Sequence, residues 1–224
     1  MTDSIDPAMA AAILYLTGEG AAPDPKSVVV AMQQLERQRK QPRPAYAYAQ
    51  LVGTWRLGFV SGTQKSRPRP GAKPVTQLGS GRFLPGFVTV QITYGPLLSD
   101  RQLSDLELSD LKTTSSAVIA EEAMTKIGSV KNEVILGPVR LQLSGPTRFW
   151  SKTNSLAFDF TRLKAQVSEL TLYQGSIRNG EKRDQAFATQ ALKDQAFFTF
   201  FCVEPDYIAA RGKGGGLALW VRQT

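Results

Sequence analysis

The chain has 224 residues, 42% of them hydrophobic and 21% charged, and a formal net charge of +8. That length and composition suit a soluble globular protein with one large domain, or one domain and an extension. It contains no histidine and a single cysteine, Cys202, which excludes histidine-based acid–base chemistry, histidine-ligated metals and an intrachain disulfide. No apolar run approaches the roughly 20 residues that cross a bilayer, so no transmembrane segment is expected. The acidic amino terminus matches neither a secretory signal nor a transit peptide.

The positive charge is concentrated in one part of the chain. Between Arg37 and Ser99 there are ten Lys or Arg residues and no Asp or Glu. A one-signed stretch of this kind attracts anionic partners, and the alternative is a solvated face without a dedicated partner. Its Pro-rich loop supplies the residues that we expect to touch an anionic membrane surface: Lys65, Arg67, Arg69 and Lys73.

The amino-terminal residues predict two helices. Ala-rich Pro7–Leu16 is followed by glycines, and Asp24 before Pro25 is a typical N-cap for a second helix over Lys26–Lys40. That second helix places Val28, Met32 and Leu35 on one face, which favours packing against a sheet. We therefore divide the chain into a helical extension, 1–45, that packs on a barrel domain, 46–224.

Leu51–Val60 predicts the first strand, because Trp55, Leu57 and Phe59 alternate with polar or small residues. The basic loop that follows leads to a strand over Phe87–Tyr94. Leu97–Lys112 is compatible with either strand or helix. Ser116–Ile127 favours a short helix, with a strand over Ala117–Ala120 as the alternative.

Alternating apolar residues in the second half predict further short strands, separated by Gly and Pro. They lie within Val134–Ser144, across a Gly137-Pro138 bend, and at Leu156–Thr161, Leu170–Ile177, Phe197–Val203, Tyr207–Ala210 and Leu217–Arg222. Many short antiparallel strands are typical of an all-β barrel or sandwich. The Gly-rich Arg211–Gly216 could suggest a phosphate loop, but a strand pattern follows it instead of a helix, so it predicts a turn.

Three motifs resemble the plastid lipid-associated proteins, or fibrillins, of the cyanobacterial type. They are Leu51-Val-Gly-Thr-Trp-Arg-Leu-Gly-Phe-Val-Ser61, the paired strands of Val130–Phe160 around Gly137-Pro138 and Gly145-Pro146, and Tyr207-Ile-Ala-Ala-Arg-Gly-Lys-Gly-Gly-Gly-Leu-Ala-Leu-Trp220. The resemblance implies a mainly β fold, an antiparallel lipocalin-like β-barrel with amino-terminal helices. It also implies barrel closure by Gly53 and Trp55, with either Arg211 or Arg222 packed over the indole.

The same resemblance implies a non-enzymatic protein that binds or organises carotenoids, prenylquinones or acyl lipids. It would act peripherally, on the cytoplasmic side of thylakoid membranes or on lipid globules, with no cofactor. The main alternative is a structural coat protein with a filled core and no ligand pocket. An enzyme or chromophore carrier that uses a carboxylate such as Asp159 is a third hypothesis. Nucleic-acid binding is a fourth hypothesis. It is disfavoured because the aromatic residues of the basic stretch form no known RNA-binding signature.

The apolar residues that alternate with polar ones in each predicted strand should all point into the interior of the barrel. They define a candidate set of ligand-binding residues. Inward-facing residues of a barrel either fill it or line a cavity, so the same set would form the core in the coat-protein alternative. The set consists of Trp55, Phe59, Val90, Ile92, Leu141, Leu143, Phe158 and Phe160.

Overall fold

The structure is a computed structural model that describes residues 5–40, 43–65, 76–97 and 127–223. Its helices are α1 (Pro7–Thr17), α2 (Pro25–Gln38), α3 (Tyr48–Leu51) and α6 (Gly180–Phe187), with a 3-10 turn at Leu192–Asp194. The strands, in chain order, are β1 (Gly53–Val60), β2 (Thr63–Lys65), β3 (Thr76–Leu78), β4 (Arg82–Phe83), β5 (Val88–Tyr94), β6 (Ile127–Leu136), β7 (Val139–Trp150), β8 (Ser155–Phe158), β9 (Arg162–Val167), β10 (Leu170–Ser176), β11 (Ala196–Val203), β12 (Tyr207–Gly212) and β13 (Leu217–Arg222).

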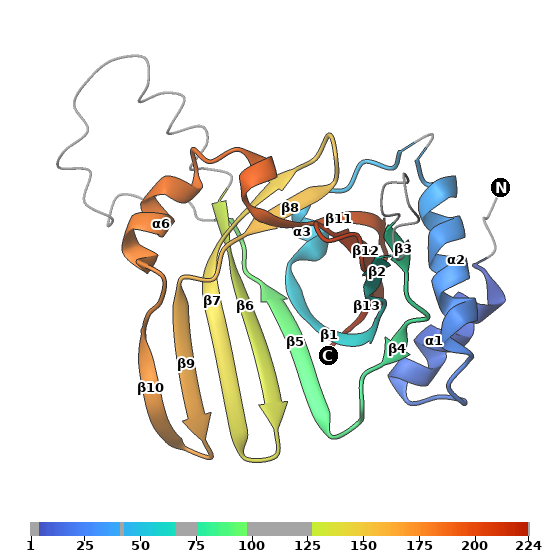
Figure 1. The fold of residues 1–224 in the computed structure, drawn as a ribbon, viewed down its shortest axis with the longest axis horizontal. Coiled ribbons are helices and arrows are strands. Elements are labelled where there is room, and N and C mark those ends of the chain that lie inside the picture. Colours follow the sequence, from blue (N-terminus) through green and yellow to red (C-terminus); the bar gives the residue numbers. More distant parts are fainter. Residues whose placement is uncertain (1–4, 41–42, 66–75, 98–126, 224) are drawn as a thin grey trace, which may run out of the picture.

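Among the described residues, eight antiparallel strands close into a barrel in the order β7-β6-β5-β1-β13-β12-β11-β8, and β8 returns to β7 (Figure 1). The first and last of these strands in sequence pair directly, with Trp55 opposite Arg222. This pairing removes two exposed edges. The predicted mainly β fold, with an antiparallel barrel and amino-terminal helices, is confirmed.

Strand β7 is long enough to take two partners on one side. Its second half, Thr147–Trp150, pairs with β8 and closes the barrel. Its first half, Val139–Ser144, pairs with β9, and β9 pairs with β10. The sheet therefore continues past the barrel as an open extension, at the left of Figure 1.

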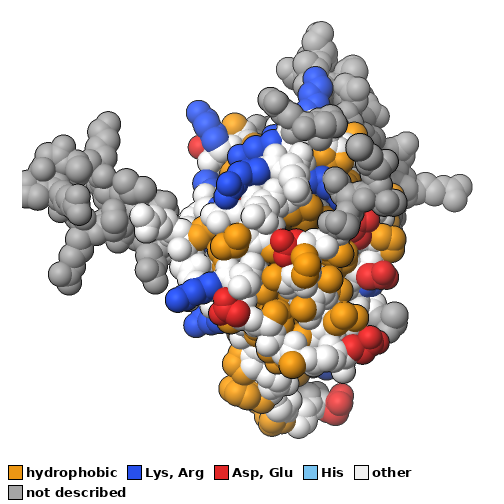
Figure 2. All heavy atoms as spheres, turned by 90° about the vertical axis from the view of Figure 1, so that its right-hand side faces the viewer, with side chains coloured by type: hydrophobic (Ala, Val, Ile, Leu, Met, Phe, Trp, Pro, Cys, Tyr) orange, Lys and Arg blue, Asp and Glu red, His pale blue; other side chains and the backbone are white. Residues whose placement is uncertain are grey.

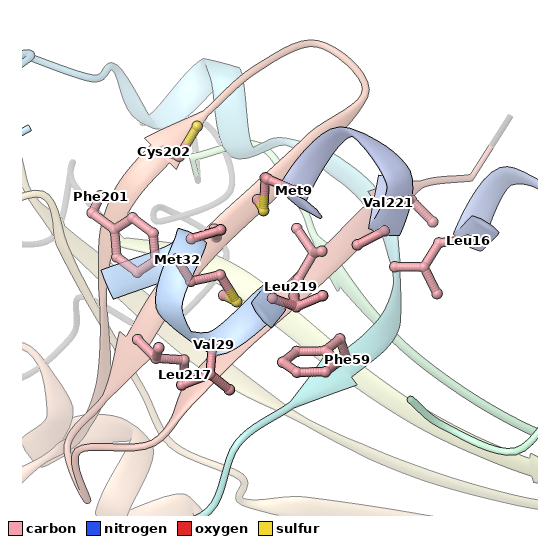
Figure 3. Packing of buried hydrophobic residues seen from close by; sticks show 14 residues of the cluster. Met9, Leu16, Val29, Met32, Phe59, Phe201, Cys202, Leu217, Leu219 and Val221 are labelled. Atoms are coloured by element: carbon pink, nitrogen blue, oxygen red, sulfur yellow. The ribbon is translucent and has the colours of Figure 1, made fainter. Parts of the chain in front are cut away.

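Helices α1 and α2 cover the outer face of the barrel wall. Asp24 caps α2 as predicted, and its carboxylate accepts a hydrogen bond from the Ser27 amide at 3.0 Å. Met9 and Leu16 of α1 and Val29 and Met32 of α2 pack on apolar side chains of β1, β11 and β13 (Figure 3). Among the described residues, no helix combines the length and apolarity needed to cross a bilayer.

The structure alters several predicted elements. Leu51 ends α3 instead of opening β1, and β6 and β7 are longer than the alternating pattern indicated. Strand β9 and helix α6 were not predicted. Arg211–Gly216 includes a turn between two strands, as expected. The undecided segment Leu97–Lys112, apart from Leu97, and the predicted helix at Ser116–Ile127, apart from Ile127, lie outside the described residues; Ile127 itself begins β6.

Candidate functional site: the open apolar face of the barrel

The closed part of the barrel is filled by its own side chains. Its largest aromatics are at most 4% exposed: Trp55, Tyr94, Phe200 and Trp220. The Trp55 indole nitrogen donates to the Leu51 carbonyl at 2.7 Å, which joins the core to α3. Such close packing is characteristic of a protein interior, and it leaves no space for a ligand among these side chains.

Arg222 closes one end of this core. Its guanidinium carbon lies 3.9 Å from the centroid of the Trp55 ring, and its two terminal nitrogens donate to the carbonyls of Val52 and Gln50 at 3.2 and 3.3 Å. Gly53 makes room for it, because a Cβ at Gly53 would lie 2.6 Å from an Arg222 nitrogen, and its φ of +129° also disfavours other residues. Of the two arginines that the resemblance proposed, Arg222 packs on the indole.

Arg211 has a different role, so its assignment to barrel closure is wrong. Its guanidinium forms two hydrogen bonds with the Glu36 carboxylate of α2, at 2.8 and 2.5 Å. These bonds raise the pKa of Arg211 above its usual value. Two parallel bonds of this kind fix orientation as well as charge, and here they tie α2 to β12.

The barrel opens where β1 separates from β5. These strands pair only over Gly53–Arg56, and the register of β1 against β13 shifts between Leu57 and Phe59. Such a bulge bends the strand and reverses which side chains point inward. Beyond it, β1 pairs with β4, so the residues of β5 from Val88 to Val90 face no β1 partner.

The bulge also corrects the prediction for Phe59, which does not share an interior with Trp55. Phe59 is fully buried on the outer side of the wall, beneath the helices and beside Val29 and Leu219 (Figure 3). Gly58, next to Phe59, lets α1 approach β1 closely, because a Cβ at Gly58 would lie 2.3 Å from the Leu16 side chain of α1.

Three phenylalanines stand at the mouth between the packed core and the open extension. The rings of Phe158 and Phe198 stack with centroids 5.1 Å apart, and Phe160 lies 5.3 Å from Phe158. All three are only partly buried against the core. Sequence reasoning missed Phe198, because the continuous apolar run of β11 has no alternation that reveals an inward phase.

From this mouth an apolar surface continues over five strands. Residues directly opposite each other in antiparallel pairs share a face. One register row joins Val90, Val134, Leu141 and Ala165, and the next towards the core joins Ile92, Asn132, Leu143 and Leu163. Ile92 is 4% exposed in the core, whereas Leu141 is 39% exposed. We call this surface the open apolar face; it comprises Val88, Val90, Val134, Leu136, Val139, Leu141, Leu143, Leu163, Ala165, Val167 and Leu170.

The predicted ligand-binding residues therefore fall into four places. Trp55 and Ile92 belong to the packed core, and Phe158 and Phe160 line the mouth. Val90, Leu141 and Leu143 lie on the open apolar face, and Phe59 lies outside the barrel. The structure brings Val90, Leu141 and Leu143 onto the open apolar face, and it places Phe158 and Phe160 together beside the packed core.

Polar groups on this side are few. Asn132 occupies a row position between Ile92 and Leu143, so one amide lies among these apolar side chains. The Tyr94 hydroxyl is buried and has no hydrogen-bond partner among the residues that the structure describes, and burial raises the pKa of Tyr94 far above its usual value. An apolar bed with few polar groups selects ligands that are apolar along most of their length.

Asp159 is the carboxylate named in the enzyme hypothesis, and the structure shows its partners. The Asp159 carboxylate, a candidate acid in the enzyme hypothesis, accepts from Arg183 at 2.6 Å and from the Phe160 amide at 2.9 Å. Within the described ranges, no three His, Cys, Asp or Glu residues gather in a group that could hold a metal ion. Of the predicted membrane-surface residues, Arg67, Arg69, Lys73 and the side chain of Lys65 lie outside what the structure describes.

A groove of about 660 Å³ lies elsewhere, between α2 and the segment Gln77–Ser80, with Arg211 in its wall. Its lining mixes Lys26, Gln33 and Gln77 with Val29 and Val30, and it is open to solvent. Because it combines charged, polar and apolar groups without enclosing them, we place the candidate site on the open apolar face.

Comparisons with known proteins do not identify a family. No family model matches the chain, and no curated protein matches it. Among solved structures, a redesigned β-barrel aligns over 80% of this chain and 96% of its own, with 9% sequence identity and a TM-score of 0.29. A likeness at that level has no bearing on what the chain binds, so the function has to be argued from the site.

Proposed function

We propose that the chain is a non-enzymatic binder of elongated apolar lipids, such as a carotenoid, a prenylquinone or an acyl lipid. The observation that carries the proposal is the continuity of the barrel interior with the open apolar face. Ile92, Leu141 and Leu170 all lie on the side of the sheet that faces the barrel interior. The Ile92 side chain is buried there, whereas Leu141 is 39% exposed and Leu170 is 66% exposed. Contiguous exposed apolar surface on a folded protein marks an interaction site.

Burial of an apolar ligand can supply useful affinity. A chain-like ligand that removes roughly 500 Å² of apolar surface from water gains about 12 kcal/mol at about 25 cal/mol per Å². Loss of translational and rotational freedom opposes this by about 4 kcal/mol or more. The remainder of about 8 kcal/mol corresponds to micromolar binding. Phe158 and Phe160 at the mouth would hold the end of the ligand that lies against the packed core.

A second candidate function is a coat protein with a filled core and no bound ligand. The observation in its favour is the dense packing of Trp55, Phe200 and Trp220 in the closed part of the barrel. In that case the open apolar face would lie against a lipid surface without enclosing single molecules.

The cellular setting is also a proposal. The motifs around Trp55, Gly137-Pro138 and Gly214 support membership of the plastid lipid-associated proteins, and with it a peripheral position on thylakoid membranes or lipid globules. The net charge of +8 and the basic stretch with Lys65, Arg67, Arg69 and Lys73 support contact with an anionic membrane surface.

Titration with a fluorescent polyene fatty acid tests the ligand proposal. The wild-type protein should bind it saturably, and carotenoid or quinone should displace it. Leu141→Arg puts a charge on the open apolar face and should abolish binding, since the ligand would have to desolvate it. Gln142→Arg is the matched control on the opposite, polar face and should bind normally. Non-saturable binding by the wild type, or equal affinity of both variants, would leave the coat-protein function.

A further inference from the structure

The open apolar face ends in a register row of apolar residues at one edge of the molecule, and the exposed Phe87 precedes the first of them. Val88, which follows Phe87, lies opposite Leu136; Leu136 lies opposite Val139; Val139 lies opposite Val167; and Val167 lies opposite Leu170. The β4–β5 connection and the β6–β7 and β9–β10 turns thus meet at the lower edge of Figure 1. We call Phe87, Leu136, Val139, Val167 and Leu170 the apolar edge.

The residues of the apolar edge are highly exposed. Phe87 is 73% exposed and Leu170 66%, and the other three range from 36% to 49%. Figure 2, which views the molecule from the side of α1 and α2, shows hydrophobic side chains among the charged ones at its lower end. Single exposed apolar residues are ordinary, but a row contributed by three separate connections is a contiguous patch.

Backbone hydrogen bonds order the connections that form the apolar edge. The Ser168 amide of the β9–β10 turn donates to the Pro138 carbonyl of the β6–β7 turn at 2.7 Å, so the two turns are joined. The Val88 amide donates to the Pro85 carbonyl at 3.0 Å and turns the chain beside Phe87. A surface that is already ordered loses little conformational entropy when it binds.

The charges behind the edge favour an anionic partner. Arg140 follows Val139 and lies on the polar face of the sheet, and Lys164 lies on that face in the neighbouring strand. From Ile127 to Ser176 there are six Lys or Arg residues and three Asp or Glu, of which only Glu169 lies in a turn of the edge. In an anionic bilayer the negative headgroups lie outside the apolar acyl chains. Apolar side chains at the edge and basic side chains farther from it would match these two layers.

We propose that the apolar edge inserts into the surface of an anionic phospholipid bilayer. Phe87 and Leu170 would enter the acyl boundary, with Arg140 and Lys164 at the level of the headgroups. The sheet would then stand on the membrane, and a lipid could pass onto the open apolar face without crossing water. That entry route rests on the proposed lipid-binding function, whereas the docking does not.

Flotation with vesicles tests the docking, using equimolar phosphatidylcholine and phosphatidylglycerol, and phosphatidylcholine alone. The wild type should bind both, and the anionic vesicles more tightly. Phe87→Ser/Leu170→Ser should weaken binding to both about a hundredfold or more, because each of the two apolar side chains contributes a factor of about ten or more on burial. The matched control is Leu14→Ser/Val30→Ser, which replaces helix residues of 49% and 50% exposure and should bind as the wild type does.

The docking proposal would be overturned by unchanged vesicle binding in Phe87→Ser/Leu170→Ser, by equal loss in the helix control, or by no binding of the wild type. A wild-type dimer that this edge variant converts to monomers would also overturn it, since the edge would then be an interface between two copies. The fatty-acid titration separates the two proposals. Phe87→Ser, which lies outside the open apolar face, should weaken vesicle binding and still take up soluble probe, whereas Leu141→Arg should not take it up. Failure of the wild type to bind the probe contradicts the ligand proposal alone.

Discussion

The guanidinium of Arg222 stacks on the indole of Trp55, with 3.9 Å between its central carbon and the ring centroid. The two residues are direct partners in the β1–β13 pairing, so one contact joins the first strand of the barrel to the last. A cation over an aromatic face contributes about 0.5–2 kcal/mol, depending on how far it is desolvated.

Arg222→Ala should lower the free energy of unfolding by about 2 kcal/mol, because the hydrogen bonds to Val52 and Gln50 are lost with the stacking. Arg222→Lys should recover part of this, since an ammonium group keeps the charge but cannot make the same forked bonds. Urea denaturation followed by tryptophan emission measures both. If Arg222→Ala unfolds at the wild-type urea concentration, the contact does not close the barrel.

Gly58 and Leu16 should be energetically coupled. Gly58→Ala would place a methyl group 2.3 Å from a Leu16 side-chain atom, and overpacking of this kind costs about 1–3 kcal/mol. In Gly58→Ala/Leu16→Ala the two changes relieve each other, so the double variant should lose less stability than the single losses predict together. Gly62→Ala is the control, because no atom of the described residues lies within 4 Å of its added Cβ. Strict additivity would mean that α1 does not pack on β1 there.

Glu36 should anchor α2 to the barrel through Arg211. Glu36→Gln removes the charge from a pair that is 16% exposed at Glu36 and 29% at Arg211, and should cost about 1–2 kcal/mol. Hydrogen exchange should accelerate in α2 while β5 and β6 remain protected. Arg37→Gln, one residue further along the helix, is the comparison variant. Equal exchange in the two variants would show that apolar packing alone holds the helix.

Stability should decrease in mildly alkaline solution because of Cys202. Burial raises the pKa of its thiol from 9.0 to about 11, so the unfolded chain loses this proton at lower pH than the folded one does. The contribution of the protonated Cys202 thiol to the free energy of unfolding is complete below pH 9 and is lost as the pH rises to about 11. Burial also raises the pKa of Tyr46, Tyr48 and Tyr94, which extends the loss to higher pH.

Thermal unfolding measured from pH 7 to pH 11 should show this decline, with an onset near pH 9. Cys202→Ala should move the onset upward by about one pH unit, towards the range where tyrosines titrate. The folded thiol should also resist alkylation at pH 8, because it is fully buried. Rapid alkylation of the native protein would contradict both expectations.

The sequence predicts the strands well where apolar alternation is unbroken, as in β5 and β13. It fails at Phe59, where the alternation continues through a bulge that only the pairing with β13 reveals. Gly58 inside a strand was the available signal, since glycine in a strand often marks a bulge. The short β9 was missed although Leu163, Ala165 and Val167 alternate with polar residues.

The candidate site depends on information that is not local in sequence. The alternation of Leu141 and Leu143 places them on the inward phase, but it does not reveal whether β8 or β9 lies beside them. Since β9 takes that place, the barrel is open there and Leu141 is exposed. The choice between Arg211 and Arg222 likewise depends on strand register and on the position of α2.

The pairing of β1 with β13 imposes an order on folding. Arg222 and its acceptor Val52 are 170 positions apart, whereas β6–β7 and β9–β10 are hairpins of neighbouring strands. Long-range pairs form slowly, because the chain between them must first be confined. During synthesis the hairpins can form before β13 emerges, and until then Trp55 has no closing strand. Truncation before Leu217 should therefore yield a soluble or aggregated intermediate with an uncovered core, instead of a smaller barrel.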